Sequence, residues 1–90
     1  MPFVGYERFV IRLTASEREI VTREIVGNGG HQRLLAECAR QLGDDGDVLV
    51  LDGRTIDTMS RYAYAYGGGG YQVRFRALVA AARRAGWSAP

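Results

Sequence analysis

The sequence predicts a mostly helical α+β fold: an internally duplicated strand–helix–glycine loop–helix unit, with four helices and a small two-stranded ribbon. Three observations lead to this prediction. Gly27–Gln32 recurs forty residues later as Gly67–Gln72, the segments after both loops share one apolar spacing, and a short β-type run opens each copy. We therefore expect a single domain over residues 1–90, with pseudo-repeats at 9–43 and 47–86.

Each copy is expected to begin with a strand. Phe9–Leu13 and Val48–Leu51 are short runs rich in β-branched and aromatic residues. They are the only candidate strands, so they should pair with each other. A lone two-stranded ribbon is marginally stable in water, so helices must cover one of its faces.

A helix should follow each strand, because each strand ends at a residue that can cap a helix. Thr14, with Glu17 three residues later, forms a capping box. Asp52 can accept a hydrogen bond from a free backbone amide in the same way. The predicted helices cover 15–26 and 53–66.

The second of these helices has a competing interpretation. Asp52-Gly53 between extended runs is a strong hairpin signal, and the tyrosines in 62–66 alternate with the period of a strand. The repeat favours a helix because it constrains both copies together. One broad face of that helix would carry Ile56, Met59, Ala63 and Tyr66.

The helices after the glycine loops are amphipathic and end at glycines. Gly43 and Gly86 lie where a left-handed residue commonly closes a helix, and Trp87 can fold back onto the last turn. The two expected core faces are His31, Leu35, Cys38, Ala39 and Leu42 in the first copy, and Tyr71, Phe75, Leu78, Val79 and Ala82 in the second.

Composition indicates an ordinary globular protein, with 47% apolar and 24% charged residues. No apolar run approaches the length of a membrane span, and the N-terminus lacks the pattern of a signal peptide. A single cysteine excludes an internal disulfide framework and fits a reducing compartment. We therefore expect a cytoplasmic location and no membrane partner.

Candidates for catalysis or metal binding are weak. His31 and Cys38 share a helix face but lie about 10 Å apart along the axis, too far for a thiolate–imidazole pair, and are expected to be core or boundary residues. Asp44, Asp45 and Asp47 lack the spacing of a calcium loop and are expected to form a solvated turn. Glu17, Glu19 and Glu24 are expected on a solvated helix face. We predict no enzyme activity, cofactor or metal.

The glycine loops have two interpretations. Each leads into a helix N-terminus, where free amides favour an anion. The alternative, which we favour, is a tight helix–helix turn, because neither loop matches a known phosphate-binding signature. The candidate anion-binding residues are Gly29, Gly30, Gln32, Gly69, Gly70 and Gln72.

Charge is unevenly distributed along the chain. Residues 1–60 carry seven arginines and ten acids, a net charge of −3, whereas residues 61–90 carry five arginines and no acid, a net charge of +5. Arginine and tyrosine are the residues that dominate protein-binding hot spots, and they also hold single-stranded nucleic acid. The candidate partner-binding residues are Arg61, Tyr62, Tyr64, Arg74, Arg76, Arg83 and Arg84.

From this constellation we expect a non-catalytic interaction module that docks on a protein through its Tyr/Arg-rich C-terminal half. A nucleic-acid-binding module that uses the same basic surface and the glycine-loop helix N-termini is the alternative. A second copy of the chain is a further candidate partner.

One short segment resembles a known family. Leu13–Ile20 is similar to the opening of the helix-turn-helix output domains of response regulators. The tight turn and recognition helix that follow in that family are replaced here by Gly27–Gly30, so the resemblance implies no function for this chain.

Overall fold

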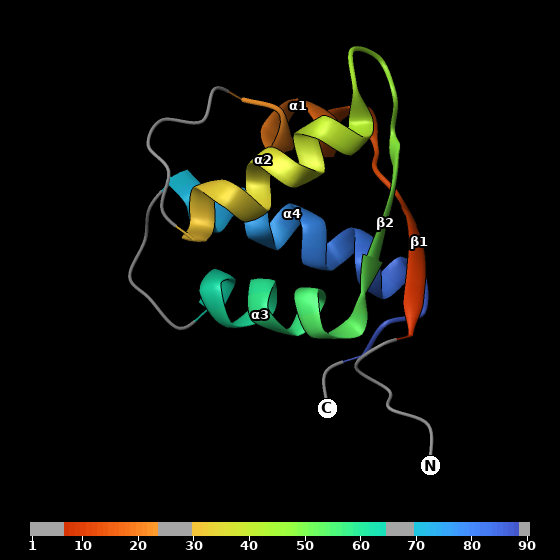
Figure 1. Ribbon diagram of the computed structural model, residues 1–90, viewed down its shortest axis with the longest axis vertical. Helices are drawn as coiled ribbons and strands as arrows, with labels where there is room; N and C mark the ends of the chain where they lie inside the picture. Colours follow the sequence, from red (N-terminus) through yellow and green to blue (C-terminus); the bar gives the residue numbers. More distant parts are fainter. Residues whose placement is uncertain (1–6, 24–29, 65–69, 89–90) are drawn as a thin grey trace.

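In the computed structural model, which describes residues 7–23, 30–64 and 70–88, the elements alternate as strand, helix, helix, twice over (Figure 1). They are β1 (Arg8–Arg12), α1 (Ala15–Val21), α2 (Gly30–Leu42), β2 (Val48–Asp52), α3 (Gly53–Tyr64) and α4 (Gly70–Arg84). The predicted α+β class, with helices beside a two-stranded sheet, is confirmed. None of the helices in these ranges combines the length and apolar character needed to cross a membrane.

The predicted pairing of the two strands is confirmed: β1 and β2 form an antiparallel sheet. The ladder continues beyond both ends of the strands. The Leu13 amide donates to the Asp47 carbonyl (2.8 Å), and the Gly53 amide donates to the Glu7 carbonyl (2.9 Å). Odd-numbered residues of β1 therefore exchange hydrogen bonds with β2, because bonded positions alternate along an antiparallel pair.

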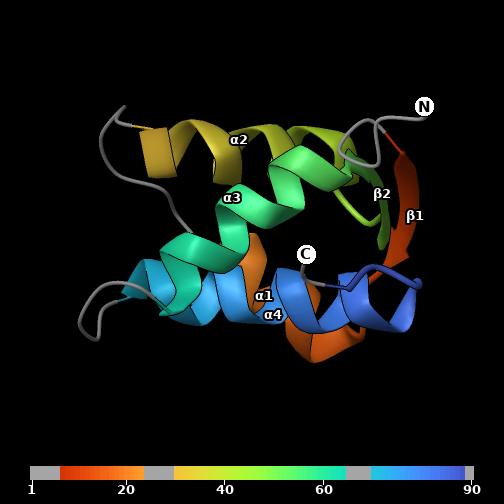
Figure 2. The ribbon, with the colours of Figure 1, turned by 90° about the horizontal axis from the view of Figure 1, so that it is seen from below.

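The helices cover one face of this sheet and leave the other open (Figure 2). Ile11, Leu49 and Leu51 point toward the helices and are buried. Val10 and Val50, which lie opposite each other in the register, are exposed on the open face. This alternation is the expected period-two pattern of a half-buried sheet.

Helix α1 begins as predicted but is shorter than predicted. The Thr14 hydroxyl accepts from the Glu17 amide (3.1 Å), and the Glu17 carboxylate accepts from the Thr14 amide (2.8 Å), which confirms the capping box. The predicted end at residue 26 is wrong, because the helix ends at Val21. The Thr22 amide makes the last helical bond, to the Arg18 carbonyl, and the Thr22 hydroxyl donates to the same carbonyl. Such bonding of a threonine hydroxyl back to its own helix disfavours further helix.

Helix α3 shows that the hairpin signal at Asp52-Gly53 was misleading. The Asp52 carboxylate accepts from the Thr55 amide (2.8 Å), so this residue caps a helix instead of opening a turn between strands. Helical spacing also buries Ile56, Met59 and Ala63, as predicted. The predicted last two residues, 65 and 66, lie outside the described ranges.

Helices α2 and α4 end at the predicted glycines, both with positive φ (65° at Gly43 and 106° at Gly86). After α4, the Trp87 amide donates to the Ala82 carbonyl (3.0 Å), and the indole is buried. This is the bonding of a Schellman cap. The predicted return of Trp87 onto the final turn is confirmed.

The core lies between the sheet and the helices, and α4 packs against both α1 and α3 (Figures 1 and 2). The predicted faces of α2 and α4 supply much of it. Their buried members are Leu35, Cys38, Leu42, Phe75, Leu78, Val79 and Ala82. Ala39 is half-buried. The side chains of His31 and Tyr71 lie outside the described part of the structure.

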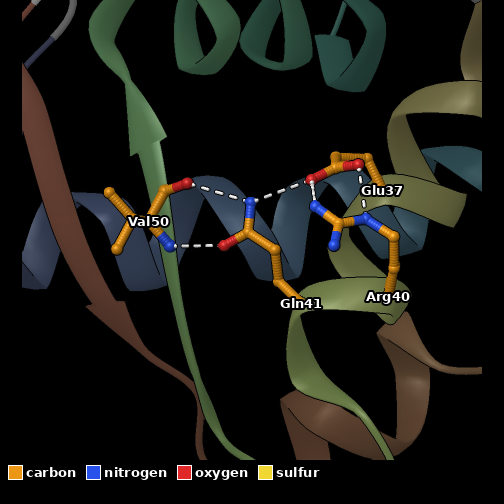
Figure 3. Close-up of polar contacts among 4 residues, drawn as sticks. All are labelled: Glu37, Arg40, Gln41 and Val50. Carbon is orange, nitrogen blue, oxygen red and sulfur yellow. Dashed lines mark hydrogen bonds and ion pairs between the residues drawn. The ribbon is translucent and has the colours of Figure 1, made fainter.

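The outer edge of β2 is closed by a side chain from α2 (Figure 3). Gln41 Nε2 donates to the Val50 carbonyl (3.1 Å), and Gln41 Oε1 accepts from the Val50 amide (2.8 Å). Gln41 Nε2 also donates to the Glu37 carboxylate (3.3 Å), which in turn pairs with Arg40. The glutamine thus replaces one residue of a third strand.

Candidate functional site

The structure separates the seven Tyr/Arg candidates into two groups at opposite ends of α4. At the first end, the C-terminal turns of α3 pack against the N-terminal half of α4: the rings of Tyr62 and Phe75 lie 5.6 Å apart. This end carries Arg61, Tyr62, Tyr64, Arg74 and Arg76. At the other end, beside the sheet, lie Arg83 and Arg84.

Tyr64 and Arg76 form the most organised pair of the first group. The guanidinium carbon of Arg76 lies 5.5 Å from the centre of the Tyr64 ring, within the range of a cation–π contact. Arg76 Nε also donates to the Ala63 carbonyl (3.2 Å), which links α4 to the last turn of α3. The tyrosine remains 55% exposed. Both residues are therefore held in place and accessible to a partner.

The other members of the first group differ in exposure. Arg61 is exposed and pairs with Asp57 one helical turn earlier (3.3 Å). Tyr62 and Arg74 are half-buried, and the Tyr62 ring packs on the core. Surface ion pairs of the Arg61 type contribute little to stability.

The outer face of α4 continues this surface toward the sheet. Val73, Arg76, Ala80 and Arg83 are all exposed and recur at helical spacing. Arg76 and Arg83 therefore share one flank of α4, with an alanine between them. We call Tyr64 and these four residues the α4 face.

Arg84 differs from its neighbour Arg83, because it is committed to a contact within the chain. Its Nη1 and Nη2 donate to the two carboxylate oxygens of Glu17 (2.9 and 2.5 Å), and Nη2 also donates to the Arg12 carbonyl (3.2 Å). The Arg84 hydrogen bonds lower the pKa of Glu17, while partial burial opposes them. The expectation that Glu17 lies on a solvated face was wrong, because its side chain is only 14% exposed.

The candidate anion-binding loops lie largely outside the described residues, Gly29 and Gly69 among them. Gly30 and Gly70 begin α2 and α4. Gln72 is buried and Gln32 is half-buried. The described part of each loop is therefore the first residue of a helix, and the glutamine belongs to the first turn of that helix.

The residues considered for catalysis or metal binding are placed as follows. Cys38 is buried in the core, and burial raises its thiol pKa to about 12, so it is protonated and unreactive at neutral pH. The aspartates at 44, 45 and 47 are exposed, as predicted. Within the described ranges, no three His, Cys, Asp or Glu residues are grouped to hold a metal ion.

The turn that contains these aspartates is held by a contact that no pattern in the sequence predicts. The Arg18 guanidinium reaches from α1 and donates to the carbonyls of Gly43, Asp44 and Gly46 (3.2, 2.5 and 2.6 Å). The Gly46 amide also donates to the Leu42 carbonyl (2.9 Å). An arginine on an amphipathic helix gives no sequence signal of such a distant contact.

Comparisons with protein-family models, curated proteins and solved structures find no significant match to this chain. The resemblance of Leu13–Ile20 to helix-turn-helix output domains gains no support from them. The surface therefore has to be interpreted from its own chemistry.

Proposed function

We propose that this chain is a non-catalytic interaction module that docks on a protein partner through the α4 face. The observation that carries the proposal is the Tyr64–Arg76 stack. An exposed tyrosine and arginine that are already held in place lose little side-chain entropy on binding. Tyr and Arg are also the residues that most often dominate binding energy at protein interfaces.

The composition of the α4 face favours a protein over a nucleic acid. Val73 and Ala80 are apolar and lie on the same flank as the two arginines. Protein interfaces combine apolar contact with a few arginines, whereas phosphate binding requires a denser row of cations. Arg84 is occupied by Glu17, which reduces the free positive charge at this end of α4.

Two further expectations from the sequence, an internal duplication and a cytoplasmic location, accompany this proposal as inferences. We infer an internal duplication from the matching element order, the side-chain caps at Thr14 and Asp52, and the positive-φ glycines that end α2 and α4. We also infer a reducing, cytoplasmic location from the buried single cysteine, Cys38. An experimental structure in which the two halves fail to superpose would contradict the duplication.

The test uses two variants with the same change in net charge. Arg76→Ala with Arg83→Ala alters the α4 face, and Arg33→Ala with Arg40→Ala alters exposed arginines on α2. Each immobilised chain is presented with nuclease-treated extract of the native host. We expect a protein that is retained by the wild type and the α2 variant and lost from the α4-face variant. Equal retention by both variants would contradict docking through this face.

A further inference from the structure

The two edges of the sheet are closed differently. At β2, Gln41 bonds both outward-facing backbone groups of Val50 (Figure 3). Val10 is the residue opposite Val50 on β1. Among the residues that the structure describes, none bonds to the Val10 amide or carbonyl.

The direction of the free groups follows from the ladder. Odd-numbered residues of β1 bond to β2, so the amides and carbonyls of Arg8, Val10 and Arg12 face the outer edge. The Arg12 carbonyl confirms this direction, because it accepts from Arg84 on α4. Among the described residues the Val10 amide and carbonyl have no such partner, and unpaired edge groups are a template for another strand.

A hollow runs along this edge. It has a volume of about 420 Å³ and lies between β1 and the last turns of α4, which pass beside β1 in Figure 2. Opposite β1 it is lined by Ala81 and Arg84 of α4 and by Ala85, the residue after the helix. Arg84 reaches across to the Arg12 carbonyl at one end, and the two alanines have short side chains. Val10, on the opposite wall, is 67% exposed.

The side chains along β1 indicate the chemistry of an added strand. Arg8, Val10 and Arg12 share the open face of the sheet, and all are exposed. Within the described ranges, neither arginine forms an ion pair. An apolar residue opposite Val10, with acidic residues two positions to either side, matches this face in both charge and hydropathy.

We propose that the outer edge of β1 binds an extended acidic peptide as a third strand. The Val10 amide and carbonyl pair with the peptide backbone, and Arg8 and Arg12 pair with its acidic side chains. Strand addition of this kind takes affinity from main-chain bonds and specificity from alternate side chains. The hollow beside α4 accommodates the residues that point to the helical side.

A second copy of the chain fits this edge poorly. Two β1 strands paired antiparallel about Val10 would place Arg8 of each copy opposite Arg12 of the other. Like charges directly opposite each other destabilise a strand pair. The β1 edge uses no residue of the α4 face, so its test is independent of the proposed function.

The test is an NMR titration of the full chain with a peptide of about seven residues, an ordinary strand length. The peptide has valine at its centre, aspartate two positions to either side and threonine elsewhere. We expect saturable shifts confined to β1 and to the α4 residues that line the hollow. Arg8→Glu with Arg12→Glu should weaken binding roughly tenfold or more, because two attractive pairs become repulsive.

The charge control is Arg23→Glu with Arg33→Glu, which makes the same change in net charge at exposed positions elsewhere. It should leave the affinity within about twofold, because distant exposed charges are screened by salt. Equal weakening by both charge-reversed variants would show nonspecific attraction and overturn the proposal. Shifts that map away from β1 would overturn it as well.

Backbone pairing is tested separately from charge. A peptide N-methylated at its central valine keeps its charges but loses the donor, and we expect it not to bind. Val10→Pro removes the outward amide, and proline is tolerated on an edge strand, so this variant should fold and fail to bind. The proposal would be overturned if the methylated peptide bound as tightly as the parent peptide, or if folded Val10→Pro bound the parent peptide as tightly as the wild type does. Dimerisation of the free chain through β1 would overturn it as well. If Val10→Pro does not fold, the test rests on the affinity of the methylated peptide for the wild-type chain.

Discussion

Arg84, in the last turn of α4, donates two hydrogen bonds to the carboxylate of Glu17, 67 residues earlier in the first turn of α1. Glu17 also accepts from the Thr14 amide, so the same carboxylate caps α1 and fastens it to α4. Bidentate pairs between arginine and carboxylate are stronger than ordinary hydrogen bonds. The pair links the beginning of the fold to its end.

This pair predicts a pH-dependent contribution to stability. The pKa of Glu17 is lowered in the folded chain from its ordinary 4.5, chiefly by Arg84. Its contribution is therefore complete above that ordinary value and is lost as pH falls through the lower, folded-state pKa. Glu17→Gln should reduce the free energy of unfolding by about 1 kcal/mol at neutral pH, since solvent screens the exposed arginine.

The measurement is urea denaturation of the wild type and Glu17→Gln over a range of acid pH. The stability difference should shrink as the solution becomes more acidic. Glu19→Gln, at an exposed position on the same helix, is the control and should show little difference at any pH. A difference for Glu17→Gln that grows on acidification would contradict the account.

We expect the hydrogen bonds between Gln41 and Val50 to protect the outer edge of β2. Gln41→Ala removes both bonds to Val50, so we expect a loss of about 1 kcal/mol and faster hydrogen exchange of the Val50 amide. Arg40→Ala, which removes only an exposed ion pair, should leave both the stability and the Val50 exchange rate nearly unchanged. Unchanged exchange at Val50 in Gln41→Ala would show that the contact does not protect this edge.

The core prediction concerns the two helices that follow the glycine loops. Phe75→Ala should destabilise the fold by about 3–5 kcal/mol and Leu35→Ala by about 2–5 kcal/mol, because both side chains are buried. Val73→Ala, on an exposed position of α4, should change stability by less than about 0.5 kcal/mol. Thermal denaturation compares the three, and an unchanged midpoint for Phe75→Ala would contradict the packing.

Because Cys38 is buried, we expect its reaction with a thiol reagent to depend on unfolding of the chain. Because burial raises its pKa to about 12, iodoacetamide should not alkylate the folded chain at mildly alkaline pH. The same reagent in denaturant should alkylate it fully. Rapid alkylation of the folded chain, at a rate matching the denatured one, would show that Cys38 is accessible.

Local signals in the sequence predicted much of this fold. The caps at Thr14 and Asp52, the glycines at 43 and 86, and the apolar spacing of the last helix all act over a few residues, so pattern reveals them. At 53–64 the helical cap and buried face outweighed the hairpin signal. The early end of α1 was missed because Thr22 bonds back to its own helix.

The site was harder to predict, because its arrangement depends on contacts between distant segments. The helix period alone places Arg76 and Arg83 on one flank of α4. It could not show that Arg84 is occupied by Glu17, or that Arg76 stacks on Tyr64. Such contacts depend on how the helices cross, and the crossing of two helices produces no periodic pattern in the sequence.

The most direct test of docking through the α4 face compares two ligands on one variant. Arg76→Ala with Arg83→Ala is titrated with the protein partner captured from the host, and with an unrelated single-stranded oligonucleotide at low and high salt. We predict that the variant keeps its melting temperature and loses about 2 kcal/mol of partner binding, roughly thirtyfold in affinity, while the oligonucleotide binds weakly throughout. Tight oligonucleotide binding that falls steeply with salt and disappears in the variant would contradict the protein-docking account.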